Sequence, residues 1–364
     1  MGGARCQKEK HRMRRPHILR RFARALAGSI CVVVVLAAAA AGVQELATRS
    51  DQHSFAPPGR LVEVEGHRLH IRCMGNDGPT VILEAMGDGT SVNWAWVQPQ
   101  VAELTRVCAY DRAGRGWSEA SPAPRDALHI AQELRSLLAN AGEVPPFVLV
   151  GHSFGGLVTR MYAAAFPHEV AGMVIVDGGQ PDIRSARFPA EGSQGQAQEE
   201  QLMRAAPVLA RLGVFRLRGL STDLPPAASA ELNAHYASAR LWDSLYAEML
   251  ALPLSDAQVR GAGSLGDRPL MIVNASRPDD AILRANNAMQ VELLSLSSNS
   301  RRLVVDGASH GSLVFNPRHA AETGAAILDV ARAVRSGGQL GPRAALDPSG
   351  MTSSTEKAQT PRDE

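Results

Sequence analysis

The sequence predicts an α/β protein with a mostly parallel sheet covered by helices on both faces. Three observations support this. Short buried-strand patterns alternate with helical patterns from about residue 60 to 336, as in parallel sheets. The hexapeptide GHSFGG at residues 151–156 stands between a strand pattern and a helical pattern. Residues 178–265 interrupt the alternation with several helical patterns, and we expect them to project as a lid over the carboxyl edge of the sheet.

The charge of the chain is balanced overall but strongly biased at its start. The chain has 364 residues, 38 basic against 36 acidic residues and a net charge of +2, so no nucleic-acid partner is indicated. Residues 1–24 hold nine Lys or Arg residues and one acid, and the 19 residues 25–43 carry no charge. As a helix, residues 25–43 would measure about 28 Å, close to the thickness of a bilayer core.

The N-terminal pattern predicts either a membrane anchor or a signal peptide. The basic flank, residues 1–24, should stay cytoplasmic and the rest of the chain should lie outside. A cleaved signal peptide is the alternative, because residues 37–41 offer A-x-A cleavage sites. We favour an uncleaved transmembrane anchor because residues 25–43 exceed a usual signal core. The globular part is thus expected outside the cytoplasm, either membrane-anchored or secreted.

The strand and helix patterns divide the rest of the chain. Residues 44–59 are interpreted as a linker, residues 60–177 and 266–336 as the core, 178–265 as the lid and 337–364 as a disordered tail. Strands are expected at 61–64, 68–73, 80–84, 106–110, 146–150, 171–176, 269–273 and 302–305, and helices at 101–104, 125–141, 157–165 and 319–335, with one more ending near 296.

Two smaller features belong to this interpretation. The Glu65-Gly66 turn predicts a β-hairpin, with His67 and His70 on exposed strand faces. Of the four cysteines, Cys73 and Cys108 lie in the exported part and form either a disulfide or two buried free thiols. The cysteine spacing matches no metal site, and we expect neither a metal nor a cofactor.

The hexapeptide is typical of a nucleophile elbow. A buried strand, a G-x-S-x-G turn and a helix follow one another, and this order exposes the Oγ of Ser153 at the carboxyl end of the sheet. The bare pattern also occurs by chance, so its strand-before and helix-after context carries the prediction. Ser153 is therefore the predicted nucleophile.

A serine nucleophile needs a base, and the base needs a carboxylate to orient it. His310 follows the last strand in a Gly/Ser-rich loop and is the predicted base, whereas His152 is interpreted as structural. Asp279 is the preferred acid because it follows the strand 269–273, in the chain order Ser, Asp, His. Asp280 and Asp177 remain alternatives.

The negative oxygen that forms during acyl transfer needs two N–H donors. The backbone of Phe154, the residue after the nucleophile, is one predicted donor. Gly87 is the other, because it lies in the Gly-rich loop after the strand 80–84. The alternative for Gly87 is a plain turn.

These residues resemble the α/β-hydrolase superfamily, specifically its lid-bearing serine esterase and peptidase-like branch. The resemblance covers about residues 60–335 and rests on GHSFGG at 151–156, DRAGRGWS at 111–118 and GASH at 307–310. It implies eight strands, with the second antiparallel and beside the fourth. This order would bring Cys73 and Cys108 onto neighbouring strands and favours the disulfide. The chain departs from the family where Ala85-Met86 replaces a His-Gly pair and where Pro278 interrupts the acid loop.

The sequence thus predicts a serine hydrolase that cleaves an ester, or in second place an amide, of a small apolar molecule through an acyl-enzyme. An acyltransferase or perhydrolase with the same triad is one alternative, and an inactive membrane-anchored binding module is another. Dehalogenases and epoxide hydrolases of this fold use an aspartate nucleophile, which Ser153 disfavours. The substrate is expected to be a small molecule.

Overall fold

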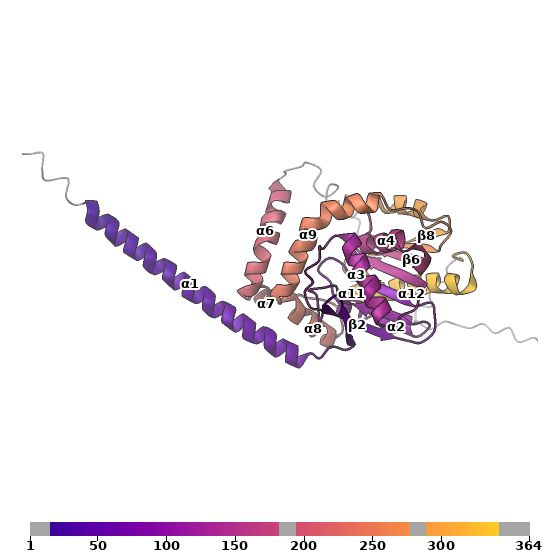
Figure 1. Cartoon of the computed structure of the whole chain (residues 1–364), viewed down its shortest axis with the longest axis horizontal. Coiled ribbons are helices and arrows are strands. Elements are labelled where there is room, and N and C mark those ends of the chain that lie inside the picture. The colour runs from indigo at the N-terminus through magenta and orange to yellow at the C-terminus, as the bar shows by residue number, and fades with distance from the viewer. Residues whose placement is uncertain (1–14, 182–193, 277–288, 342–364) are drawn as a thin grey trace, which may run out of the picture.

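The computed structural model describes residues 15–181, 194–276 and 289–341. Its centre is an eight-stranded sheet with the order β1-β2-β4-β3-β5-β6-β7-β8 (Figure 1). All neighbouring strands from β4 to β8 pair in parallel, and β2 pairs antiparallel with both β1 and β4. The strands are β1 Arg60–Val64, β2 His67–Met74, β3 Val81–Glu84, β4 Val107–Tyr110, β5 Phe147–His152, β6 Val170–Val176, β7 Leu270–Ala275 and β8 Ser300–Val305. The predicted fold class and the place of β2 are confirmed.

The sheet is covered on both faces because side chains alternate along its strands. Phe147 and Leu149 of β5 point into one apolar cluster, with α3 (Ala127–Asn140) and α4 (Gly155–Ala165). Val148 and Val150 point into the opposite cluster, with helices α2, α11 and α12. These last helices are α2 Val97–Ala102, α11 Ser312–Phe315 and α12 Pro317–Ser336, and three 3₁₀ helices cover Ser91–Trp94, Pro167–Glu169 and Leu293–Leu296.

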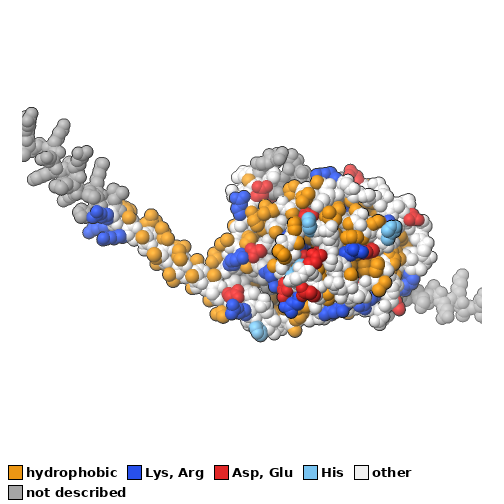
Figure 2. Space-filling model, viewed as in Figure 1, with side chains coloured by type: hydrophobic (Ala, Val, Ile, Leu, Met, Phe, Trp, Pro, Cys, Tyr) orange, Lys and Arg blue, Asp and Glu red, His pale blue; other side chains and the backbone are white. Residues whose placement is uncertain are grey.

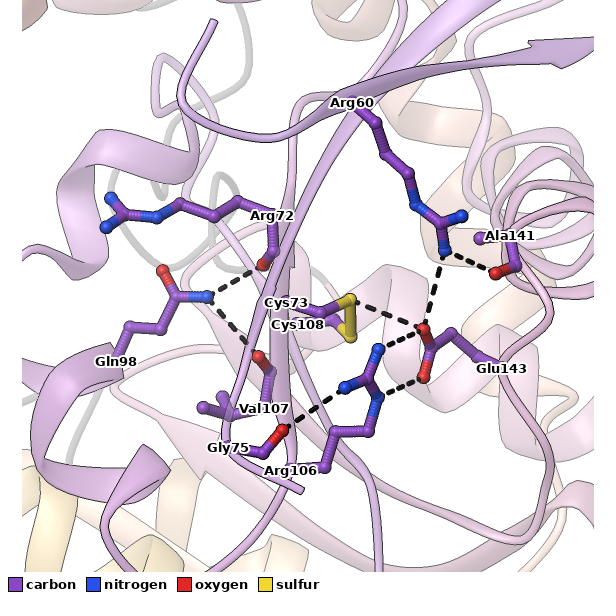
Figure 3. Close-up of a disulfide and its surroundings, with 10 residues drawn as sticks. All are labelled: Arg60, Arg72, Cys73, Gly75, Gln98, Arg106, Val107, Cys108, Ala141 and Glu143. Carbon is purple, nitrogen blue, oxygen red and sulfur yellow. Dashed lines mark hydrogen bonds and ion pairs between the residues drawn. A yellow bond between two sulfur atoms is a disulfide. The ribbon is translucent and has the colours of Figure 1, made fainter. Parts of the chain in front are cut away.

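A disulfide joins Cys73 of β2 to Cys108 of β4 (Figure 3). The two residues are direct partners in the antiparallel register. Beside them, the Arg106 guanidinium forms an ion pair with Glu143 at 2.7 Å. The disulfide that the family resemblance favoured is therefore present, and the interpretation as two free thiols is wrong.

Between β6 and β7, the described residues form an insertion of four helices. They are α6 Gln194–Arg211, α7 Val214–Arg218, α8 Pro226–Tyr236 and α9 Ala239–Arg260. Their own small core contains Phe215 stacked on Trp242, with ring centroids 3.8 Å apart. Helix α9 then returns to the sheet, where Val259 joins the cluster of α3 and α4.

Helix α1 runs without a break over Arg15–Ser54. Its first part projects away from the globular part (Figure 1), and hydrophobic side chains cover it after a basic start (Figure 2). By length and composition, it is one helix that could cross a membrane. The expected linker at 44–59 is helical as far as Ser54, because residues 44–54 pack on the insertion. The Gln44 side chain is buried there and donates to the Ala237 carbonyl at 2.8 Å.

The remaining expectations fall partly outside the described residues. The predicted closing helix is α12, whose first N–H groups are capped by the Asn316 side chain. The helix expected before residue 296 is described only from residue 289, and the predicted tail only up to residue 341.

Candidate active site

Ser153 lies on the turn between β5 and α4 with a positive φ of 56°, which non-glycine residues seldom adopt. Its N–H donates to the Val176 carbonyl at 3.0 Å, and its carbonyl accepts from the N–H groups of Gly156 and Gly179 at 3.0 and 3.2 Å. The side chain remains partly exposed. The turn is thus held between β6 and the start of α4 and keeps the hydroxyl out of the core.

Two close approaches around this turn require glycine. A Cβ on Gly155 would lie 2.7 Å from the carbonyl oxygen of Ala85, far inside van der Waals contact. A Cβ on Gly178 would collide with the Ser153 backbone. The turn therefore packs directly on the loop after β3, which contains Gly87, and on the segment after β6, which contains Asp177.

His310 pairs with Asp177. The Nδ1 atom of His310 lies 2.7 Å from Oδ2 of Asp177, whose side chain is fully buried, while 39% of the His310 side chain is exposed. The other carboxylate oxygen of Asp177 accepts from the Ala275 N–H at 3.4 Å. Burial alone would raise the pKa of Asp177, but its hydrogen bond and the charge of His310 bring that pKa below the usual value.

The carboxylate on His310 thus comes from the end of β6, next to Gly178 and the elbow. The preferred sequence assignment, Asp279, and its neighbour Asp280 lie outside the described residues. The acid was expected to hydrogen-bond to His310, and in the structure Asp177, the remaining alternative, forms that hydrogen bond. Asp177 can do this because β6 is the direct parallel neighbour of β5, which carries Ser153.

His152 supports the His310 loop from within the core. Its ring is buried, its Nε2 lies 3.2 Å from the His310 carbonyl, which accepts the hydrogen bond, and the two ring centroids are 4.7 Å apart. Burial, and then the charge of His310, lowers the pKa of His152 to about 3. A neutral His152, the residue before Ser153, therefore supports the His310 loop from within the core.

This depressed pKa predicts acid sensitivity. An unfolded histidine binds a proton near pH 6.5, but folded His152 binds one only near pH 3. The unfolded state thus holds more protons in between, and the stability that His152 contributes above pH 6.5 is lost as the pH falls. From pH 7 to 5 we expect a loss of about 2 kcal/mol, measured by urea unfolding. His152→Gln should remove this part of the pH dependence, and an unchanged dependence would contradict it.

The two predicted N–H donors belong to residues that face each other. A Cβ on Gly87 would lie 3.9 Å from the Cβ of Phe154. The same Cβ would lie 3.9 Å from Leu245 of α9, so the insertion reaches the loop after β3. Gly87 and Phe154 therefore lie close together beside the elbow, near α9.

Arg112 holds the loop after β3 by its backbone. Its guanidinium donates to the carbonyls of Ala85 and Met86 at 2.8 Å each and of Gly87 at 2.9 Å. It also donates to Glu84 at 2.5 Å, and all of its side chain is buried. Three consecutive carbonyls turned toward one cation leave the loop little freedom, which fixes the N–H groups that alternate with them.

A second carboxylate in this cluster comes from the insertion. Glu248 of α9 accepts from Arg112 at 3.0 Å and from Arg115 at 2.6 Å. Burial alone would raise the pKa of Glu248, but the two arginines bring it below the usual value. Sequence reasoning singled out residues 111–118 as a family motif but missed Arg112 as a support of the loop. No local signal points to Glu248, because its partners lie more than 130 positions away.

The histidines of the hairpin are buried, so their predicted exposure is wrong. His70 is fully buried and its Nδ1 lies 2.9 Å from Oδ2 of Asp111. Asp111 also accepts from the N–H groups of Ser91 and Trp117 at 2.6 and 3.0 Å. His67 is buried against Glu133 at 3.1 Å. The error arose because alternation alone does not show that both faces of β2 are covered.

Within the described residues, Cys73, Cys108 and Glu143 come close enough together to hold a metal ion. Both sulfur atoms are used in the disulfide, and Glu143 is paired with Arg106 (Figure 3). This cluster therefore serves as a structural link between β2, β4 and the segment before β5.

Residues 87–325 match the model of the alpha/beta hydrolase family. The chain belongs to this family. The match includes the elbow, Asp177 and His310, and it agrees with the observed strand order. The chain is accordingly a hydrolase-family enzyme.

Relatives and solved structures agree with this family. The uncharacterized protein YqjL of Bacillus subtilis is 27% identical over 203 residues, covering 54% of this chain and 79% of its own length. The 2-hydroxy-6-oxo-2,4-heptadienoate hydrolase of Pseudomonas putida is 30% identical over 125 residues, covering 32% and 44%. Two solved structures share the fold: the epoxide hydrolase CorEH (TM-score 0.52, 20% identity, 72% and 95% covered) and Est816, described as degrading N-acyl homoserine lactones (TM-score 0.54, 17% identity, 72% and 98% covered).

Proposed function

We propose that this family member is a serine hydrolase that cleaves a carboxylic ester of a small apolar molecule through Ser153, His310 and Asp177. The observation that carries the proposal is the 2.7 Å pair between His310 and Asp177. The residue after Asp177, Gly178, packs against the backbone of Ser153, which has a φ of 56°. A serine hydroxyl reacts only when a base takes its proton, and an imidazole oriented by a buried carboxylate is such a base.

The proposed reaction forms an acyl-enzyme. His310, neutral and donating Nδ1–H to Asp177, accepts the Ser153 proton on Nε2 as Oγ attacks the ester carbonyl carbon. The imidazolium that forms is stabilised by the Asp177 carboxylate and then protonates the leaving alcohol. Water, deprotonated by His310, attacks the acyl-enzyme and releases the acid and free Ser153.

The negative oxygen of each tetrahedral intermediate is assigned to the N–H groups of Phe154 and Gly87. The hydrogen bonds from Arg112 to the carbonyls of residues 85–87 support this role. They fix the loop that carries the Gly87 N–H, and donors that are already in place need no rearrangement during the reaction. Leu245 of α9 lies over Gly87. We assign the insertion the role of a lid on this basis.

An ester is the proposed substrate because of the residue at the elbow. A serine nucleophile forms an acyl-enzyme with esters and, less readily, with amides. Epoxide hydrolases of this fold have an aspartate at the nucleophile position, where this chain has Ser153. The description of Est816 as a lactone-degrading enzyme is compatible, since a lactone is a cyclic ester. Acyl transfer to an alcohol or peroxide would use the same triad.

We further propose that residues 25–43 anchor the enzyme in a membrane, with the catalytic part outside the cytoplasm. The apolar helix and the basic residues before it support this orientation. The disulfide between Cys73 and Cys108 also fits an oxidising compartment.

The test is the release of p-nitrophenol from acyl esters by the full-length protein, before and after treatment with a fluorophosphonate. Turnover that stops once Ser153 carries the phosphonyl group, located by peptide mass, supports the proposal. Turnover that persists after full modification of Ser153 contradicts it. Product analysis with added alcohol separates hydrolysis from acyl transfer.

A further inference from the structure

Gln44, the first residue after the apolar stretch of α1, forms hydrogen bonds to the insertion. Gln44 is only 5% exposed, and its Nε2 donates to the Ala237 carbonyl at 2.8 Å. Its Oε1 accepts from Nε of Arg216, in α7, at 2.8 Å. Helix α7 therefore lies beside the point at which residues 25–43 end.

A second contact fixes the direction of α1 on the insertion. Asp51, two helical turns after Gln44, forms an ion pair with Arg216 at 2.7 Å. Two turns correspond to about 10 Å along the helix. Two contacts on the same face of α1 restrict its pivoting against α7, so an anchored α1 would set the orientation of the insertion toward the membrane.

The insertion presents an apolar face next to this junction. We call it the α6–α7 face and define it by Leu202, Val208, Val214 and Leu217, whose exposed fractions are 52%, 59%, 40% and 89%. In Figure 1, α6 and α7 lie on the side of the globular part from which α1 projects. This face is thus the part of the insertion that meets the boundary at residue 43.

Basic residues are interspersed with these apolar side chains. Arg204 and Arg218 are exposed in the same two helices, whereas the exposed Arg211 is paired with Asp243 at 2.7 Å. Exposed Leu and Val residues mixed with Arg are typical of helices that lie in the headgroup layer of a bilayer, because the apolar groups enter it and the cations meet lipid phosphates. The acidic pair Glu199 and Glu200 precedes Leu202, so the face begins after it.

We propose that the α6–α7 face rests in the headgroup layer of the same bilayer that holds residues 25–43. This inference rests on the proposed membrane anchor and not on the ester chemistry. Transmembrane helices tilt by about 20° on average, so a tilt of α1 toward the insertion would bring this face onto the membrane. The insertion would then be held at the membrane surface at both α1 and α7.

The experiment uses the full-length protein in vesicles of phosphatidylcholine with a minor share of phosphatidylglycerol. Leu217→Cys is labelled with bimane in a Cys6→Ser, Cys31→Ala background, which keeps the Cys73–Cys108 disulfide. Lipids with a nitroxide near the headgroup quench a label that lies in that layer. Val144→Cys is the matched control, because Val144 is 76% exposed just before β5, at the sheet edge opposite the elbow.

Quenching several-fold stronger at position 217 than at position 144 is the expected result. Equal quenching at both positions, in protein that floats with the vesicles, overturns the docking while leaving the anchor intact. Protein that does not float overturns the anchor and this inference together. If the label at position 217 is already shielded from solvent in detergent and the protein forms concentration-dependent dimers, the α6–α7 face binds a second copy of the chain. That result would overturn the proposed docking on the bilayer.

Discussion

Ser153→Ala is expected to lower kcat/KM for a p-nitrophenyl acyl ester by a factor of about 10⁴ or more. The variant removes the only atom that can form the acyl bond and leaves the hydrogen bonds of the turn in place, since these involve the Ser153 backbone. The residual rate should come from binding and from the N–H groups alone. Initial rates at matched enzyme concentration measure the effect.

The control for this variant is Ser295→Ala, an exposed serine in the 3₁₀ helix Leu293–Leu296. It should keep full activity, and both variants should unfold at the temperature of the unchanged protein within a few degrees. A Ser153→Ala protein that is folded and still hydrolyses the ester at an undiminished rate would end the case for a serine nucleophile.

Asp177→Asn is expected to lower kcat by a factor of about 10³ to 10⁴ with a much smaller change in KM. An amide at this position has no negative charge to stabilise the imidazolium, and its NH₂ group can donate to Nδ1 and favour the wrong tautomer, although its shape hardly changes. The 2.7 Å contact with Nδ1 makes Asp177 the group on which this orientation depends. Full saturation curves give kcat and KM separately and so measure both changes.

Asp279→Asn and Asp280→Asn are the matched variants, because both aspartates were candidates for the same role. Each should retain activity within a factor of about two, a loss far smaller than the one expected for a triad acid. A loss at Asp279 as large as that expected for Asp177, with Asp177→Asn nearly unaffected, would return the acid to the loop after β7.

Local sequence patterns predicted the strand–turn–helix order around Ser153 and the place of His310 after the last strand, and the structure has both. Ser153 stands in a strand–turn–helix order that forces its conformation, and His310 follows the last strand in a loop. Because parallel strands all end at one edge of the sheet, both residues had to lie at that edge. The strands and the covering helices follow from periodicity, and the structure contains them. The family followed from the resemblance of three motifs, and the family match confirms it.

The tertiary structure showed contacts that the sequence had left open. Asp177 was only an alternative acid, but the pairing of β6 with β5 brings the residue after it against Ser153, whereas Asp279 lies outside the described residues. The ion pair between Glu248 and Arg112 joins segments that lie 136 positions apart in the sequence. Residues 44–54 are helical because Gln44 and Asp51 bind the insertion. Periodicity shows which face of a segment is apolar. Only the packing of the chain decides which distant segment covers that face.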